Sequence, residues 1–390
     1  MLKVKLMNKI AKVGTDVLSS LKYEVSDCVE NEDAIMVRSA SLHETVFPDN
    51  LRAIARCGAG VNNIPVEKCT EKGIVVFNTP GANANAVKEL AIAALVLASR
   101  DIVGGVKWVE TLAGQTGVAK LVEAGKSAFV GHELAGKTLG VIGLGAIGGM
   151  VANAAISLGM NVMGYDPYIT AKAAWSLAPS VRQASDYNEI FANCDYITLH
   201  VPATPQTKNM ICENSIAKMK DGVRILNLAR ADLVNAADVK KALQDKKIAA
   251  YVTDFPTDET AGAEGIIAIP HLGASTVESE DHCAVMAAQE LDEFLTCGNI
   301  RNSVNFPSVS IPFSEKPRVC IMNKNVPNML TQITSAFSAE EINIENLANG
   351  SKGEIAYTIV ETNVAADEKI LKNLSKIEGV FGVRVYAWQG

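Results

Sequence analysis

The chain has 390 residues, 48% of them apolar, and its 36 Lys and Arg against 43 Asp and Glu give a net charge of −7. This composition excludes a disordered chain and a collagen-like repeat, and the length allows two to four domains of about 100–200 residues. A net acidic chain lacks the basic surface that nucleic acid requires, so we expect no such partner. No apolar run has the length of a signal peptide or a membrane span, which predicts a cytoplasmic protein with no membrane partner. The 8 cysteines lack metal-ligand spacing, and we expect no bound metal.

The first ninety residues alternate short β-rich runs with polar or helix-forming segments. The β-rich runs cover residues 33–39, 51–56 and 73–77. This alternation predicts a parallel sheet with covering helices. Apolar residues at helical spacing then predict a long helix over residues 86–100 that leads into a second unit.

The second unit contains near-continuous apolar runs bounded by Gly, Asp or Pro. They cover residues 137–143, 161–166, 195–201, 223–228 and 248–253. Such runs are typical of strands buried on both faces, so we expect a doubly wound parallel sheet. A capping-box pattern from Ser275 to Glu278 predicts a helix to about Leu295 that returns to the first unit.

The C-terminal part begins with residues 305–317, whose three prolines predict an extended linker. Beyond it, the order βαββαβ predicts a ferredoxin-like module. The predicted fold is therefore α/β, with two Rossmann-like domains and a ferredoxin-like C-terminal domain. The predicted boundaries are 1–90 plus 276–304 for the substrate domain, 91–275 for the dinucleotide domain, 305–317 for the linker and 318–390 for the C-terminal domain.

The sequence Gly143-Leu-Gly145-Ala-Ile-Gly148 follows a predicted strand and opens a predicted helix, and Asp166 ends the next strand. This pattern is the dinucleotide fingerprint, in which the glycines allow a tight turn, a close approach of the pyrophosphate and close helix packing. A carboxylate at Asp166 accepts hydrogen bonds from ribose hydroxyls and repels a ribose phosphate, which favours NAD over NADP. Flavin is the alternative, because the same fingerprint serves it.

Three polar positions follow predicted strands of the same unit, where open α/β sheets bind ligands. His271 is a candidate proton acceptor, and Arg230 is a candidate clamp for a carboxylate. An acid among Asp254, Asp258 and Glu259 is a candidate partner for the imidazole.

The chain resembles the D-2-hydroxyacid dehydrogenase family over nearly its whole length. The resemblance is carried by Val37-Arg38-Ser39-Ala40, Arg56-Cys-Gly58-Ala-Gly60-Val-Asn-Asn-Ile, Asn78-Thr-Pro, residues 137–148, Asn227-Leu-Ala-Arg230 and Pro270-His271-Leu-Gly273-Ala-Ser-Thr. The C-terminal module is similar to an ACT domain. The resemblance implies an NAD-dependent oxidation of 3-phosphoglycerate, the first step of phosphorylated L-serine biosynthesis, by a homodimer or homotetramer.

The resemblance also implies roles for individual residues. Arg230 and His271 match the catalytic arginine and histidine. An ungapped count gives Glu259 as the catalytic acid, whereas matching Phe-Pro-Thr gives Asp258, and we favour Glu259. The implied cofactor contacts are Gly143, Gly145, Ala146, Ile147, Gly148, Asp166, Pro202, Ala229, Asp254 and Gly273. The implied substrate contacts are Arg38, Ser39, Arg56, Gly58, Gly60 and Asn78, with the two arginines at the phosphate.

In the C-terminal module the resemblance implies an L-serine effector site at Asn323, Asn325 and Asn343. A dimerisation sheet with capping asparagines is the alternative for this module. For the whole chain, the alternatives are a dehydrogenase of another 2-hydroxy acid and a non-catalytic NAD-sensing interaction protein.

Overall fold

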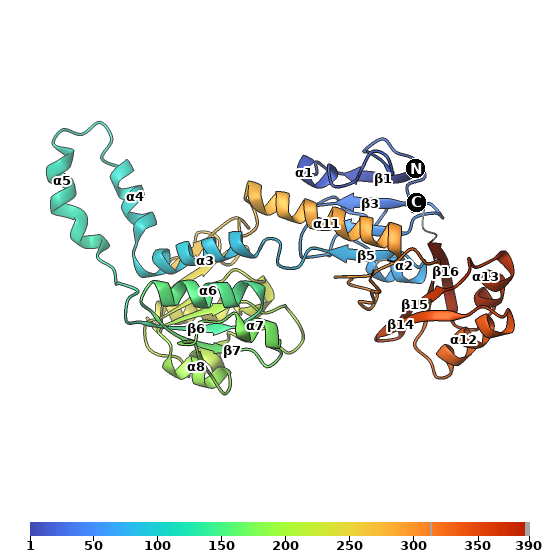
Figure 1. Ribbon diagram of the computed structural model, residues 1–390. Coiled ribbons are helices and arrows are strands. Elements are labelled where there is room, and N and C mark those ends of the chain that lie inside the picture. The colour runs from blue at the N-terminus through green and yellow to red at the C-terminus, as the bar shows by residue number, and fades with distance from the viewer. Residues whose placement is uncertain (313, 387–390) are drawn as a thin grey trace. The chain divides into compact units, whose positions relative to one another are not determined.

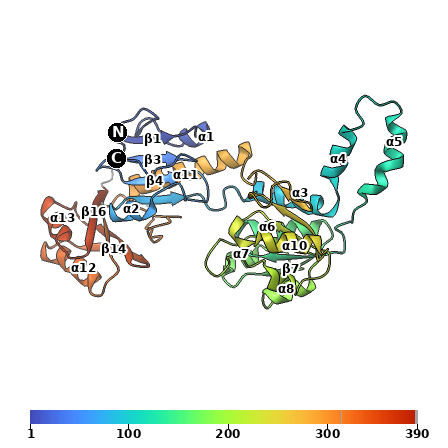
Figure 2. The ribbon, with the colours of Figure 1, turned by 180° about the vertical axis from the view of Figure 1, so that it is seen from behind.

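The computed structural model describes residues 1–312 and 314–386, and within them the chain divides into two compact units (Figures 1 and 2). The first unit joins residues 1–83 to the chain from residue 280 onward, and the second comprises residues 84–279. Within the described residues, no helix is long and apolar enough to cross a lipid bilayer.

The N-terminal sheet of the first unit is parallel, with the strand order β2-β1-β3-β4-β5. Its strands are β1 (Leu2–Met7), β2 (Tyr23–Ser26), β3 (Ala34–Val37), β4 (Ala53–Arg56) and β5 (Val75–Asn78). Its short helices are α1 (Lys12–Thr15) and α2 (Val66–Glu71). Every residue of β3 is buried, as expected of a strand covered on both faces.

Helix α11 (Val277–Cys297) returns the chain to this sheet, as the sequence predicts. Its residues Ala287, Leu291 and Phe294 join one core with β-strand residues such as Phe77. The Ser279 N–H donates to Thr276 Oγ1 over 3.1 Å, so the cap of the first turn is Thr276 and not the predicted Ser275.

The C-terminal sheet is antiparallel and has the order β14-β15-β13-β16, which is the ferredoxin-like arrangement. Its elements are β13 (Arg318–Lys324), α12 (Met329–Ala339), β14 (Ile344–Lys352), β15 (Ile355–Thr362), α13 (Glu368–Ser375) and β16 (Val380–Tyr386). On β13, Val319 and Ile321 pack against the two helices, whereas Cys320 and Met322 join the core of the N-terminal sheet. The alternating side chains of one strand therefore tie the module to the rest of the first unit.

The segment predicted as a linker carries buried residues at its start. Phe306 is fully buried, and the Asn305 side chain accepts from Val76 N–H and donates to Ile74 O. The prolines prevent regular structure there, but they do not prevent packing, so Phe306, Val309 and Ile311 belong to the core of the first unit.

The second unit contains a parallel sheet with the order β12-β11-β10-β9-β6-β7-β8. Its strands are β6 (Thr138–Ile142), β7 (Asn161–Tyr165), β8 (Arg182–Gln183), β9 (Tyr196–Leu199), β10 (Val223–Asn227), β11 (Ile248–Thr253) and β12 (Ile266–Ala268). The order reverses at β6, between β9 and β7, which creates the crevice where such sheets bind ligands.

Helices cover both faces of this sheet (Figure 1). The helices of the unit are α3 (Ala84–Ser99), α4 (Ile102–Glu110), α5 (Val118–Gly125), η1 (Lys126–Phe129), α6 (Ala146–Ser157), α7 (Ala171–Trp175), α8 (Tyr187–Asn193), α9 (Glu213–Ile216), η2 (Ala231–Leu233) and α10 (Ala236–Gln244). Helices α3 and α6 share one core, and α8 and α10 contribute to the other. Helices α4 and α5 form a hairpin that stands clear of the sheet in both views (Figures 1 and 2).

Candidate active site

The glycine-rich turn between β6 and α6 has the geometry that a dinucleotide requires. Gly143 has a φ of +90°, and a Cβ on Gly148 would lie 1.9 Å from the Gly143 carbonyl oxygen. At Gly145, the N-cap of α6, a Cβ would meet nothing within 4 Å, and no side chain caps the helix. Ala146 and Ile147 begin the helix. The free N–H groups and the open space above them fit a pyrophosphate.

Asp166 lies directly after β7 and braces this turn. One carboxylate oxygen accepts from Leu144 N–H over 2.9 Å, and the other accepts from Tyr168 N–H over 2.9 Å. Each oxygen retains a lone pair for a ribose hydroxyl. His200 lies beneath the turn, where it bonds Thr198, and burial lowers its pKa to about 4. Pro202 follows, and its carbonyl accepts from Thr207.

Arg230 follows β10 in a turn that the buried Asn227 holds together. Asn227 Oδ1 accepts from the N–H groups of Ala229 and Arg230 over 3.2 and 3.3 Å. Its Nδ2 donates to Arg230 O over 2.7 Å. The side chain of Arg230 donates to Ala229 O. The sequence motif contains Asn227, but only the structure shows that its side chain holds the backbone of the turn that carries Arg230.

Asp254 follows β11 and holds the loop that carries His271. Its two oxygens accept from Leu272 N–H and Gly273 N–H, each over 2.7 Å, and the residue is 1% exposed. Burial raises the pKa of Asp254, and these two bonds oppose that shift. His271 itself has a φ of +53°, a left-handed conformation that is uncommon outside glycine and needs such support. Asp254 therefore positions the loop, and its contact with the cofactor stays a prediction.

Phe255 is near both candidate catalytic side chains. The His271 ring lies 4.7 Å from the Phe255 ring, between centroids, at an interplanar angle of 48°. The central carbon of the Arg230 guanidinium lies 6.0 Å from the same centroid. Phe255 thus links residues 230 and 271, and the sequence patterns did not single it out.

The candidate acids lie in the turn after β11, where Asp258 and Glu259 are both exposed. Among the described residues, neither forms a hydrogen bond or an ion pair with His271. The choice between them stays open.

The candidate substrate residues of the first unit lie at the carboxyl ends of neighbouring strands. Arg56 ends β4, and in the register of the sheet it pairs with Val37 of β3 and Asn78 of β5. Arg38, one residue beyond Val37, forms an ion pair with Glu280 of α11 over 2.6 Å. The sheet therefore gathers Arg38, Arg56 and Asn78 at one edge.

Backbone geometry at this edge explains two of the other predicted residues. Gly58 has a φ of +144°, and a Cβ there would lie 1.3 Å from Arg56 Nη1, so only glycine leaves room for the guanidinium. The Asn78 side chain donates to Ala59 O over 2.6 Å, which fixes the turn that leads to Gly60. Ser39 N–H donates to Asn8.

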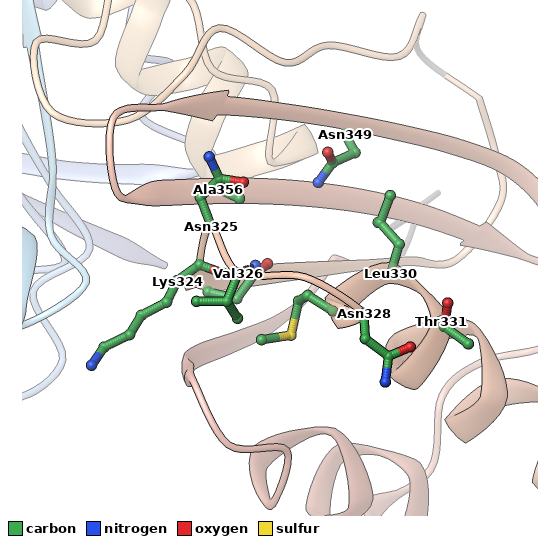
Figure 3. Close-up of a pocket in the computed structure, with 10 residues that line it drawn as sticks. Lys324, Asn325, Val326, Asn328, Leu330, Thr331, Asn349 and Ala356 are labelled. Carbon is green, nitrogen blue, oxygen red and sulfur yellow. Dashed lines mark hydrogen bonds between the residues drawn. The ribbon is translucent and has the colours of Figure 1, made fainter.

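A cavity of about 190 Å³ lies in the C-terminal module, where β13 meets the start of α12 (Figure 3). It is lined by Asn323, Lys324, Asn325, Val326, Asn328, Met329, Leu330, Thr331, Asn349 and Ala356. Asn323 is 1% exposed, and within the described residues its Oδ1 has no hydrogen-bond partner. No side chain caps α12, whose N-cap Asn328 has a φ of +68°. The cavity therefore offers one buried acceptor beside free helical N–H groups.

The predicted residues of the effector site meet only in part. Asn323 and Asn325 line the cavity, but Asn343 does not, because it lies before β14 and pairs with Asn363. Asn349, from the middle of β14, lines the cavity instead, and Figure 3 shows its amide on that strand above the start of α12.

Comparisons with known proteins agree with this architecture. Residues 92–274 match the D-isomer specific 2-hydroxyacid dehydrogenase NAD-binding domain, and residues 320–382 match an AHAS small subunit-like ACT domain. D-3-phosphoglycerate dehydrogenase 1 of Saccharomyces cerevisiae is 31% identical, over 90% of this chain and 77% of its own length. The D-3-phosphoglycerate dehydrogenase of Methanocaldococcus jannaschii is 36% identical over 78% of this chain, which spans 58% of that relative.

A solved structure extends the comparison to three dimensions. The NAD⁺-bound 3-phosphoglycerate dehydrogenase of Entamoeba histolytica is similar with a TM-score of 0.62 and 28% identity, over 78% of this chain and 98% of that chain. The chain belongs to the D-isomer specific 2-hydroxyacid dehydrogenase family.

Proposed function

We propose that the protein oxidises D-3-phosphoglycerate to 3-phosphohydroxypyruvate with NAD, as the first step of phosphorylated L-serine biosynthesis. The observation that carries the proposal is the placement of Arg230 and His271 at the carboxyl ends of one sheet, beside a dinucleotide turn at β6. A sensor that only bound NAD would need no such pair. The identity to the yeast enzyme supports the substrate.

NAD supplies the hydride acceptor when bound, and the chain supplies acid–base and charge chemistry. An imidazole nitrogen of His271 accepts the proton of the substrate hydroxyl. The fixed guanidinium of Arg230 binds the carboxylate through paired N–H donors and stabilises the oxygen of the forming ketone. An acid from the turn after β11, Glu259 or Asp258, stabilises the protonated imidazole.

The phosphate of the substrate requires cations of its own, since a dianion binds poorly without them. In the proposal, Arg38 and Arg56 supply guanidinium groups at the carboxyl edge of the first sheet. Arg38 must then exchange Glu280 for the phosphate.

The decisive experiment measures NAD-dependent turnover of 3-phosphoglycerate and 3-phosphohydroxypyruvate beside unphosphorylated hydroxy and keto acids. We expect turnover of the phosphorylated pair to exceed that of the others, and His271→Gln to reduce it by at least about a hundredfold, the scale of general-base catalysis. His282→Gln is the matched control, since it removes an exposed histidine of α11. Faster turnover of an unphosphorylated acid would contradict the assigned substrate. An active His271→Gln variant would contradict the mechanism.

We further propose that the cavity of the C-terminal module binds L-serine as a feedback effector. The N–H groups at the start of α12 suit a carboxylate, and the unpaired Oδ1 of Asn323 suits an ammonium group. Asn323→Leu should abolish inhibition by L-serine, whereas Asn343→Ala, outside the cavity, should leave it unchanged. Wild-type protein that neither binds L-serine in calorimetry nor is inhibited by it would reject this site.

For the assembly, we propose a homodimer built through the hairpin of α4 and α5. Within the described chain, no residue of either helix is buried, and Ile102, Val106, Val109 and Leu121 expose 37–54% of their surface. An apolar face of this kind is typical of a protein interface. Val106→Glu should shift the sedimentation coefficient from dimer to monomer, and an unchanged coefficient would place the interface elsewhere.

A further inference from the structure

Phe255 carries an inference that rests on the proposed function and goes beyond it. Its ring contacts the His271 imidazole and the Arg230 guanidinium at once, with centroid distances of 4.7 and 6.0 Å. The residue is half-buried and follows Asp254 directly. The backbone fixes its place, because Phe255 N–H donates to Thr253 Oγ1 over 3.1 Å.

The neighbours of the imidazole show why this contact matters. Both oxygens of the nearby Asp254 accept backbone N–H groups of the loop. Asp258 and Glu259 are exposed, and in the described residues neither bonds the imidazole. Within the described residues, the imidazole of His271 has its ring contact with Phe255.

The chemistry of an aromatic ring suits a position near two cationic groups. Arg230 is always positively charged, and His271 becomes so when it takes a proton during the proposed reaction. Like charges repel, whereas the negative face of an aromatic ring attracts both cations. A phenyl ring close to both groups therefore offsets part of their repulsion and favours the protonated imidazole.

We propose that Phe255 is a positioning residue that sets the imidazole of His271 against the guanidinium of Arg230 and stabilises the imidazolium. It acts through these two side chains and not on the substrate. A contact of this type is worth roughly a 2- to 30-fold change in rate.

The test compares Phe255→Leu, which removes the aromatic face, with Phe255→Tyr, which keeps it. Phe255→Leu should lower kcat by about tenfold, with unchanged NAD affinity and melting temperature, and Phe255→Tyr should restore kcat. A merely structural role would lower the melting temperature or weaken NAD binding in proportion to the loss of kcat. Wild-type kcat in Phe255→Leu, or equal damage in both variants, would overturn the proposal.

A second readout does not depend on the reaction. An aromatic ring at 4.7 Å should shift the His271 Cε1–H resonance, which is assigned by its disappearance in His271→Gln. Phe255→Leu should move this resonance toward that of a free imidazole, whereas Phe255→Tyr should leave it near the wild-type position. An unchanged resonance in Phe255→Leu overturns the inference whether or not the wild-type protein oxidises phosphoglycerate. A wild-type protein that does not oxidise phosphoglycerate contradicts the proposed function alone.

Discussion

Asn227 illustrates how one buried side chain determines the place of a functional one. Its amide oxygen and nitrogen both bond the backbone of the turn that carries Arg230. An amide is suited to this role because it donates and accepts at the same time, whereas a carboxylate only accepts.

Asn227→Ala should therefore lower kcat/KM for 3-phosphoglycerate without weakening NAD binding. Removing the amide takes three hydrogen bonds from the part-buried backbone of the turn, at a cost of about 1–3 kcal/mol, or roughly 5- to 150-fold if the cost appears in the transition state. Steady-state kinetics and NAD titration check this, with the exposed Asn188→Ala as control. Equal kcat/KM in wild type and Asn227→Ala would show that the turn holds Arg230 without the amide.

Glu290 on α11 gives a prediction on pH and stability. Burial raises its pKa to about 8, with a smaller contribution from Glu293, although the bond from Asn302 opposes the shift. The folded pKa exceeds the unfolded value, so the neutral form is the one that the fold favours. The stability that neutral Glu290 contributes to the fold is complete below about pH 4.5. This stability is lost as the pH rises through about 8.

Glu290→Gln imitates the neutral form at every pH. It should raise the melting temperature at pH 8–9 and change it little at pH 5, in thermal unfolding followed by circular dichroism. Glu278→Gln, an exposed acid of the same helix, is the control. A variant that gains no stability at alkaline pH relative to pH 5 would show that Glu290 is ionised in the fold without penalty.

At the scale of single elements, the two glycines at the start of α6 have separable roles. A Cβ at Gly148 would lie 1.9 Å from the Gly143 carbonyl oxygen, whereas a Cβ at Gly145 would meet nothing within 4 Å. Gly148→Ala should lower both the melting temperature and the NAD affinity. Gly145→Ala should leave the melting temperature unchanged and weaken NAD binding alone, because its methyl group occupies the space above the helical N–H groups. Fluorescence titration of NADH and thermal unfolding separate the two results, and equal destabilisation by both would refute the assignment.

The elements also show what the sequence could and could not predict. The dinucleotide turn is predictable because its backbone geometry requires glycine at fixed positions, and these positions all lie within residues 143–148. Phe255 contacts residues that are 16 and 25 positions away in the sequence. No helical or strand periodicity spans these separations, so no sequence pattern predicts the contacts. Asn349 was missed because no sequence pattern places the middle of β14 beside the start of α12. The two-residue strand β8 is exposed and lacks an apolar run.

At the scale of the whole chain, a buried ion pair joins the C-terminal module to its surroundings. The side chains of Arg318 and Glu361 are 3% and 0% exposed and meet over 2.8 Å. Arg318 also donates to the carbonyls of Cys297, Ile311 and Pro312, which lie outside the module. The pair thus fixes the end of α11 and the following segment to the C-terminal sheet.

Glu361→Gln should reduce the free energy of unfolding of the first unit by about 3–5 kcal/mol, because it leaves a buried guanidinium without its counter-charge. Glu213→Gln breaks the exposed pair with Lys241 and should leave the free energy of unfolding close to the wild-type value. Chemical denaturation measures both changes. Similar losses in the two variants would show that the buried pair adds nothing beyond a surface contact.

The assembly of the first unit from two distant stretches determines the order in which the protein can fold during synthesis. Residues 1–83 leave the ribosome before residues 84–279, yet their core includes Ala287, Leu291 and Phe294, which are made about 200 residues later. At about 5–20 residues per second, the N-terminal strands wait roughly 10–40 s for these partners. The intervening residues 84–279 complete their own sheet meanwhile. Residues 1–83 are therefore translated before residues 84–279 but enclosed after them, and during this interval a nascent-chain chaperone would meet their apolar strands.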